Sequence, residues 1–235
     1  MIAPNVQHSQ GVTLVGGGAL GGRDLRLALA RAPMAVAADS GADRLLAAGI
    51  LPDAVIGDFD SISSETMRKL PADRLHPAPA QDRTDFVKAL QRIKAPLVLA
   101  VGFTGARMDH GLAVMNGLVL LPNHRCIVIG PKDIAFAAPP ELALRLCPDD
   151  PLSLFPMTRL EGSSEGLHWP LQGLEFAPDA MIGTSNKVAR PEVRMSFNRP
   201  GMLTILPRKR LDAAIKALAA APFWPESDGS AAHDR

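Results

Sequence analysis

Short, fully apolar runs alternate with helical patterns over the first half of this 235-residue chain. The runs are too short for helices and rich in Val, Ile, Leu and Ala, as strands buried on both faces are. We expect strands at residues 12–15, 34–38, 54–56, 97–101 and 126–129, and helices at 24–32, 42–48, 63–70, 84–93 and 109–121. Because strands separated by helices pair in parallel, we predict a three-layer, Rossmann-like α/β domain with a mostly parallel sheet and ligands at the carboxyl ends of its strands.

The pattern changes near residues 132–140, where Pro139 and Pro140 interrupt it. Short strand-like segments separated by Gly, Pro and Ser follow, at residues 152–156, 166–171, 174–176, 193–197 and 202–206. Their even spacing predicts a smaller C-terminal all-β domain of sandwich or barrel type, closed by a helix at 211–220. We expect the α/β domain at 11–135, the β-rich domain at 136–222, and disordered termini at 1–10 and 226–235.

Charge and cysteine content narrow the class of protein. The 25 Lys and Arg residues nearly balance 24 Asp and Glu residues, so the chain lacks the basic excess typical of nucleic-acid or membrane-surface binding. Cys126 and Cys147 form no CxxC pair, which argues against a zinc site and against a disulfide scaffold. The chain has neither an apolar run of about eighteen residues nor a signal-peptide pattern. We therefore expect a cytoplasmic protein that binds small molecules.

A glycine-rich loop follows the first predicted strand of the sheet. Gly16, Gly18 and Gly21 fit the pattern GxGxxG, and Asp39 ends the next strand, where an acid that binds ribose would stand. One interpretation is a dinucleotide-binding oxidoreductase. The other is a tight strand-to-helix turn, whose glycines let backbone N–H groups approach a phosphate closely.

Aspartates recur after successive strands of the predicted sheet. They are, in chain order, Asp39, Asp58, Asp60, Asp82, Asp85 and Asp109. Any one of them also fits a helix cap or a solvated position, but together they are expected at one edge of the sheet. Close carboxylates repel each other by roughly several kcal/mol per pair unless a cation lies among them. Oxygen ligands of this kind suit Mg²⁺, so the sequence predicts a metal–nucleotide site.

Five segments in series resemble the motifs of the thiamine pyrophosphokinase family. They are ADSGADRLL from Ala38, PDAVIGDFDS from Pro52, QDRTDFVKAL from Gln81, GARMDHGLA from Gly105 and GTSN from Gly183. Their order and spacing also agree with the family, and the resemblance covers residues 12–206. The chain departs from the family at Ser40, Asp43 and Val87, where glycine, asparagine and glutamate are usual. None of these departures removes a predicted metal ligand.

The resemblance implies an Mg²⁺-dependent enzyme that transfers the β,γ-diphosphate of ATP to the hydroxyl of thiamine and releases AMP. It implies catalytic and metal-binding roles for Asp58, Asp60, Asp82 and Asp85. On the ATP side the corresponding residues are Asp39, Gln81, Thr84, Lys88, Arg107, Asp109 and His110. His110 fits a structural hydrogen bond at the helix start at least as well as a phosphate contact.

The thiamine side of the site is implied to lie in the β-rich domain and to be completed across a homodimer. Ser185 and Asn186 resemble the thiamine-contacting pair, although a polar turn would explain the same residues. Trp169 offers either a ring for stacking or a core side chain. Diphosphate transfer to another small alcohol, such as a hydroxymethyl pterin, would keep the acidic motifs without needing GTSN. A sensor without turnover is disfavoured, because the catalytic acids are retained.

Overall fold

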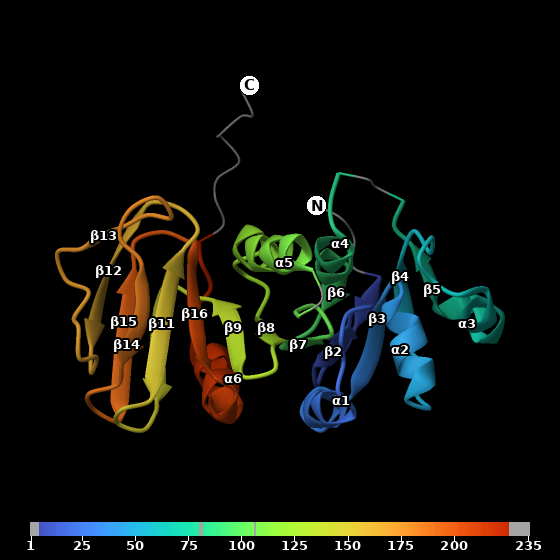
Figure 1. The fold of residues 1–235 in the computed structure, drawn as a ribbon, viewed down its shortest axis with the longest axis horizontal. Coiled ribbons are helices and arrows are strands. Elements are labelled where there is room, and N and C mark those ends of the chain that lie inside the picture. The colour runs from blue at the N-terminus through green and yellow to red at the C-terminus, as the bar shows by residue number, and fades with distance from the viewer. Residues whose placement is uncertain (1–4, 80–81, 106, 226–235) are drawn as a thin grey trace.

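A sheet of ten strands runs through the whole molecule (Figure 1). The computed structural model describes residues 5–79, 82–105 and 107–225. Six neighbouring strands of the sheet are parallel to one another. In sheet order they are β8 (Cys126–Ile129), β7 (Val98–Val101), β2 (Val12–Val15), β3 (Met34–Ala38), β4 (Ala54–Gly57) and β5 (Leu75–Pro77). The strand order reverses between β2 and β7, which is where open α/β sheets bind ligands.

Helices cover both faces of the parallel part of the sheet. Helices α1 (Gly22–Leu29) and α2 (Gly41–Ala47) share one core with Val15, whereas α4 (Asp85–Gln91) and α5 (Met108–Leu120) share the other with Leu14. Neighbouring residues of β2 enter opposite cores because side chains alternate across a strand. The short helix α3 (Ser64–Lys69) follows β4 in the chain. This three-layer arrangement confirms the predicted α/β fold.

The C-terminal half is a β-sandwich, and one of its sheets is the continuation of the large sheet. The strands β9 (Asp133–Ala137), β16 (Met202–Pro207), β11 (Pro151–Pro156) and β14 (Gly183–Lys187) extend that sheet in antiparallel pairing. A second sheet contains β10 (Glu141–Arg145), β15 (Glu192–Phe197), β12 (Leu160–Glu165) and β13 (Glu175–Phe176). Phe136 of one sheet and Met195 of the other belong to the same core, and α6 (Leu211–Ala220) packs on β10.

The predicted elements agree best where the chain is buried on both sides. The strands at 12–15, 34–38 and 126–129 and the helix at 211–220 have the predicted bounds. The strand predicted at 166–171 is wrong, because the neighbouring strand is Leu160–Glu165 and Leu167 forms only an isolated bridge with Val188. Leu167 and Leu171 are buried from a loop, so their alternation imitates a strand.

The sheet is continuous across the predicted domain boundary at residue 135. Ala135 lies inside β9 and is paired with Val128 of β8, so the division into domains stays a prediction. Part of the predicted N-terminal disorder is wrong, because β1 (Val6–Gln7) pairs with β6 (Ile93–Lys94) and Val6 is buried. The predicted tail at 226–235 lies outside the described residues. Within the described residues, the helices are too short or too polar to cross a bilayer.

Candidate active site

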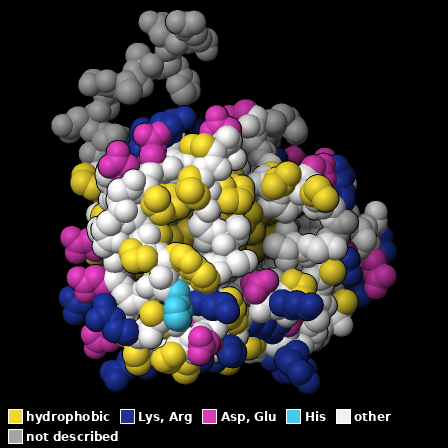
Figure 2. Space-filling model, turned by 60° about the vertical axis from the view of Figure 1, so that its left-hand side comes forward, with side chains coloured by type: hydrophobic (Ala, Val, Ile, Leu, Met, Phe, Trp, Pro, Cys, Tyr) yellow, Lys and Arg dark blue, Asp and Glu magenta, His cyan; other side chains and the backbone are white. Residues whose placement is uncertain are grey.

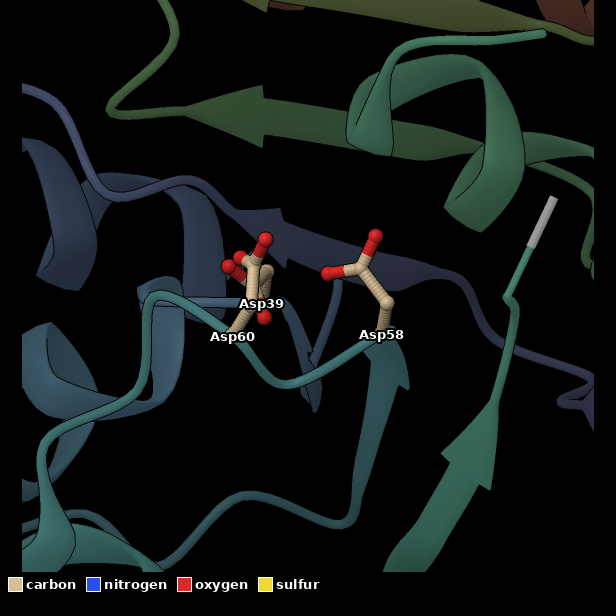
Figure 3. Close-up of side chains that lie close together, drawn as sticks. All are labelled: Asp39, Asp58 and Asp60. Carbon is tan, nitrogen blue, oxygen red and sulfur yellow. The ribbon is translucent and has the colours of Figure 1, made fainter. Parts of the chain in front are cut away.

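Three aspartates meet beyond the carboxyl ends of β3 and β4 (Figure 3). Asp39 follows β3, and Asp58 and Asp60 follow β4. One carboxylate oxygen from each of the three lies within 4.8 Å of the others. The predicted convergence of aspartates is therefore present for these three residues. Carboxylates at this spacing match the ligand type of a hard divalent cation.

The backbone is left-handed at two residues in or next to this cluster, a conformation that non-glycine residues seldom adopt. Asp39 has φ 46° and Phe59, between the other two acids, has φ 68°. Gly57 permits the close approach of the two strand ends, since a Cβ there would lie 3.0 Å from the Asp39 Cβ. Left-handed backbone at a non-glycine residue is costly and gathers at functional sites. This backbone strain therefore supports a functional role for the carboxyl ends of β3 and β4.

Asp39 is the most deeply buried of the three acids. It is 2% exposed, and burial raises the pKa of its carboxyl. Its Oδ1 has no hydrogen-bond partner among the described residues. A buried carboxylate oxygen without a donor is unfavourable by itself, and a bound cation would satisfy it. The residues present therefore fit Mg²⁺.

Lys88 of α4 forms ion pairs with two of the predicted acidic residues. Its Nζ donates to Asp58 Oδ2 at 3.0 Å and to Asp85 Oδ1 at 3.1 Å, and its side chain is only 4% exposed. Burial opposes the charge on Lys88, but the two carboxylates outweigh it and raise the pKa of the ammonium group. In turn, the hydrogen bond from Lys88 holds the pKa of Asp58 below its usual value. Both groups therefore stay charged at neutral pH.

A hydrogen-bonded loop below the acids was not foreseen from the sequence. Ser63 Oγ donates to Asp43 Oδ1 at 2.5 Å and also accepts from the N–H of Thr66, capping α3. Ser61 Oγ donates to Asp60 Oδ1 at 2.8 Å. Asp43 and Ser61 lie within the motif segments, and this is the only signal that could have pointed to them. These contacts fix the loop that carries Asp58 and Asp60.

The glycine loop is packed against its neighbours and does not present the amides of Gly16 and Gly18 to a ligand. The N–H of Gly16 donates to Val101 O and that of Gly18 to Gly102 O, both at 2.9 Å. A Cβ at Gly18 would lie 2.6 Å from Gly102 O, so close packing of two loops explains this glycine. Arg44 Nε donates to Gly17 O at 3.0 Å from the other side. The dinucleotide interpretation requires free backbone N–H groups in this loop, and those of Gly16 and Gly18 already donate to backbone carbonyls.

Three further predicted residues are Asp82 among the metal ligands and Gln81 and Thr84 on the ATP side. Asp82 is 69% exposed and contacts Arg83, and within the described residues it is not part of the three-acid cluster. Thr84 is the N-cap residue of α4 but makes no side-chain capping bond. Gln81 lies outside the described residues. These three assignments stay predictions.

Arg107 and Asp109 form a pair at the start of α5. Arg107 donates from Nε to Asp109 Oδ1 at 3.1 Å and from Nη2 to Oδ2 at 2.6 Å. This pairing lowers the pKa of Asp109 and raises that of Arg107, although both side chains are more than 60% exposed. His110 follows on the helix and is exposed. A phosphate would have to share or displace the Arg107–Asp109 contact.

Two of the three predicted thiamine-binding residues, Ser185 and Asn186, lie on a strand and not on a turn. GTSN occupies β14, where Ser185 is exposed with φ 62°. Asn186 is buried and holds a neighbouring loop, because its Nδ2 donates to Trp169 O at 2.8 Å and its Oδ1 accepts from Lys187 N at 2.8 Å. The interpretation of Trp169 as a core residue is wrong, since its side chain is 58% exposed. Asn186 thus positions the segment that presents the Trp169 ring.

The two halves of the predicted site are far apart within one chain. Eight strand-to-strand steps separate β14 from β4 in the large sheet. At about 4.8 Å a step, this corresponds to roughly 38 Å. In Figure 1 the two strands accordingly lie toward opposite ends of the long axis. One bound molecule cannot touch both groups of residues in the same chain.

Comparison with known proteins gives matches along most of the chain. Family models match residues 25–129, described as "Thiamin pyrophosphokinase, catalytic domain", and residues 145–202, described as "Thiamin pyrophosphokinase, vitamin B1 binding domain". The rice protein "Thiamine pyrophosphokinase 1" is 28% identical over 173 residues, which are 66% of this chain and 66% of that protein. The matched part thus spans slightly less than two thirds of this relative.

Solved structures of the same name share the architecture. The thiamine pyrophosphokinase of Bacillus subtilis is 25% identical, with a TM-score of 0.65 over 85% of this chain and 98% of the other. The thiamin pyrophosphokinase of Candida albicans is 15% identical, with a TM-score of 0.70 over 88% and 95%, and shows likeness of fold alone.

The fold and the site define an α/β protein with an acidic cluster at the carboxyl edge of its parallel strands and an appended β-sandwich. The two family models together cover more than half of the chain. The chain belongs to the thiamin pyrophosphokinase family.

Proposed function

We propose that this protein is a cytoplasmic thiamine pyrophosphokinase that transfers the β,γ-diphosphate of ATP to the hydroxyl of thiamine, giving thiamine diphosphate and AMP. The observation that carries the proposal is the cluster of Asp39, Asp58 and Asp60 with its buried, unpartnered carboxylate oxygen. It lies inside the segment matched by the catalytic-domain model. The second matched model, which describes a vitamin B1 binding domain, supports thiamine as the acceptor.

The acids would hold Mg²⁺, which would neutralise the charge of the triphosphate when bound. The thiamine hydroxyl oxygen bonds to the β-phosphorus as the bond from that phosphorus to the α–β bridging oxygen breaks, so AMP leaves with the electron pair. A carboxylate of the cluster accepts the hydroxyl proton. Lys88 keeps Asp58 and Asp85 in position, and Arg107 offers a planar cation to a phosphate. The contribution of the chain is therefore chiefly alignment and charge stabilisation.

We also propose that the enzyme is a homodimer whose sites combine the acidic cluster of one subunit with the Ser185 and Trp169 region of the other. The separation of roughly 38 Å within one chain supports this arrangement. Exposed apolar side chains also support a covered surface, and Figure 2 shows several groups of them on one face. Over the described residues as a whole, the large exposed apolar side chains include Met108, Leu112, Trp169, Met181 and Ile182.

The activity is tested by measuring AMP and thiamine diphosphate from ATP plus thiamine, with and without Mg²⁺. Asp60→Ala is expected to reduce turnover by at least about a hundredfold, because a ligand of the phosphate-bound cation is lost. Asp73→Ala is the matched control, because Asp73 is an exposed aspartate on a short 3-10 helix after α3. Equal, metal-dependent amounts of both products support the proposal. A hydroxymethyl pterin as the better acceptor would contradict it.

A further inference from the structure

A large cavity lies mostly at the amino ends of the parallel strands, whereas the aspartates lie at the carboxyl ends. It has a volume of about 1140 Å³. Its walls come mainly from the segments that precede β2, β7 and β8, together with the end of α4 and the chain after α6. The three aspartates, in contrast, follow the carboxyl ends of β3 and β4. Most of the cavity therefore lies away from the three aspartates, and Arg83 is the lining residue that adjoins the predicted site residues Asp82 and Thr84 in the chain.

The side chains that carry a fixed charge in the lining of this cavity are all positive. Arg83 and Lys94 line it together with His8 and His124, and the described lining residues include no Asp or Glu. Lys94 is exposed and has no carboxylate partner within the described part of the chain. Arg83 contacts Asp82 only at 3.5 Å, with both side chains largely exposed. Such a lining attracts an anion, because no carboxylate of the described residues pairs with Lys94 and Arg83 has only one long contact with Asp82.

The rest of the lining suits a flat ring. Ile93, Pro96 and Leu121 give an apolar wall, and the Phe223 side chain is 54% exposed. One face of the Phe223 ring carries the Arg125 guanidinium at 4.2 Å. An aromatic ligand can therefore stack on a ring whose position is fixed by a cation.

Two polar groups add hydrogen-bonding capacity to the cavity. Gln91 lines the cavity, and its Oε1 is a buried acceptor without a hydrogen-bond partner among the described residues. Burial lowers the pKa of His124, which leaves its imidazole neutral at pH 7 and able to donate or accept. The fixed positive charge thus comes from Lys94 and Arg83.

We propose that this cavity binds a small anion that carries a flat apolar ring, in the class of aromatic phosphate esters. Cations supply the contact for the phosphate, and Phe223 with the apolar wall supplies the contact for the ring. The inference does not depend on the activity of the acidic cluster.

Calorimetric titration of the full chain with phenyl phosphate in EDTA tests the proposal. Without divalent cations the acidic cluster repels phosphate, so binding there is suppressed. We expect one saturable site per chain, with weaker binding of inorganic phosphate and of phenol alone. Lys94→Glu should weaken phenyl phosphate binding by at least about tenfold, because attraction becomes repulsion. Phe223→Ala should weaken phenyl phosphate but not inorganic phosphate.

Two variants serve as matched controls. Lys216→Glu makes the same charge change on the exposed face of α6, and Asp60→Ala alters the acidic cluster. Both should bind phenyl phosphate as the unmodified protein does, and a thermal melt of each variant checks folding. Absence of saturable binding, binding unchanged in Lys94→Glu, or loss of binding in Asp60→Ala would each overturn the proposal.

Discussion

Asp39 belongs to the acidic cluster, and burial of its ionised carboxyl lowers the stability of the fold. Burial raises its pKa above the ordinary value near 3.8, so ionising the carboxyl is less favourable in the folded than in the unfolded chain. The folded state consequently binds more protons, and the Asp39 contribution to stability falls as pH rises from the unfolded pKa through the folded one. At neutral pH the ionised group destabilises the fold unless a cation binds it.

Asp39→Asn is accordingly expected to raise the free energy of unfolding at pH 7 by about 0.5–2 kcal/mol while abolishing turnover. Denaturant titration without metal measures the gain, which should shrink below about pH 4 as Asp39 becomes protonated in the parent protein. Mg²⁺ should stabilise the parent more than the variant, because ligand binding shifts stability by mass action. A variant that is less stable than the parent at neutral pH would contradict this account.

For single residues, the sequence predicts which side chains gather at the site better than it predicts how exposed each side chain is. Acids placed after parallel strands must share an edge of the sheet, so the meeting of Asp39, Asp58 and Asp60 could be foreseen. The exposure of Asp82 depends on a loop whose conformation leaves no pattern in the sequence. The exposure of Trp169 likewise depends on a hydrogen bond made by Asn186, a residue in a different motif.

Among the elements, the start of α2 shows how closely the first two strand–helix connections are packed. Gly41 is the first residue of α2, and a Cβ there would lie 1.9 Å from the Val15 carbonyl oxygen. That oxygen belongs to the backbone of a central strand and cannot move aside cheaply. Only glycine therefore fits between α2 and β2.

Gly41→Ala is expected to lower the free energy of unfolding by about 2–4 kcal/mol, because the clash outweighs the better helix propensity of alanine. Gly111→Ala in α5 is the matched control, since nothing lies within 4 Å of a Cβ there. That variant should be more stable by about 0.5–1 kcal/mol. Thermal or denaturant melts of the pair suffice, and an equal effect of both changes would refute the packing argument.

The sequence predicts the bounds of strands well where both faces of the sheet are buried, and less well where one face is exposed. Residues 12–15 and 126–129 are fully buried strands, and their apolar runs end where the strands end. β12 (Leu160–Glu165) reads LEGSSE, whose polar composition hides a strand that is half exposed. The predicted strands do not include β9 and β10, because Pro139 and Pro140 interrupt the apolar pattern between them.

On the scale of the whole molecule, the proposed composite site makes a test by complementation possible. Asp60→Ala disables the acidic half, and Trp169→Ala with Ser185→Ala disables the other half of the proposed site. Each variant should be nearly inactive alone, but a mixed dimer would contain one intact site and one doubly defective site. Random mixing should restore about a quarter of the parent activity, since half of the dimers are mixed and each has one working site.

Co-expression with two different affinity tags isolates the mixed dimers for this measurement. Recovered activity that disappears on dilution below the dissociation range supports the shared site. Verified mixed dimers without activity would refute it, and full activity of the Trp169 and Ser185 variant alone would remove these residues from the site.

The uninterrupted sheet has a consequence for any attempt to divide the protein. Ile129 and Val128 pair with Ile134 and Ala135, so a cut between the α/β half and the sandwich would remove β9 from β8 and leave it paired with β7 alone among the described strands. The fragment would then end in a bare, wholly apolar strand edge, which is a template for aggregation. Although the proposed function gives the two halves separate roles, their shared strand pairing joins them, and exchanging one half between relatives would require a matching strand interface.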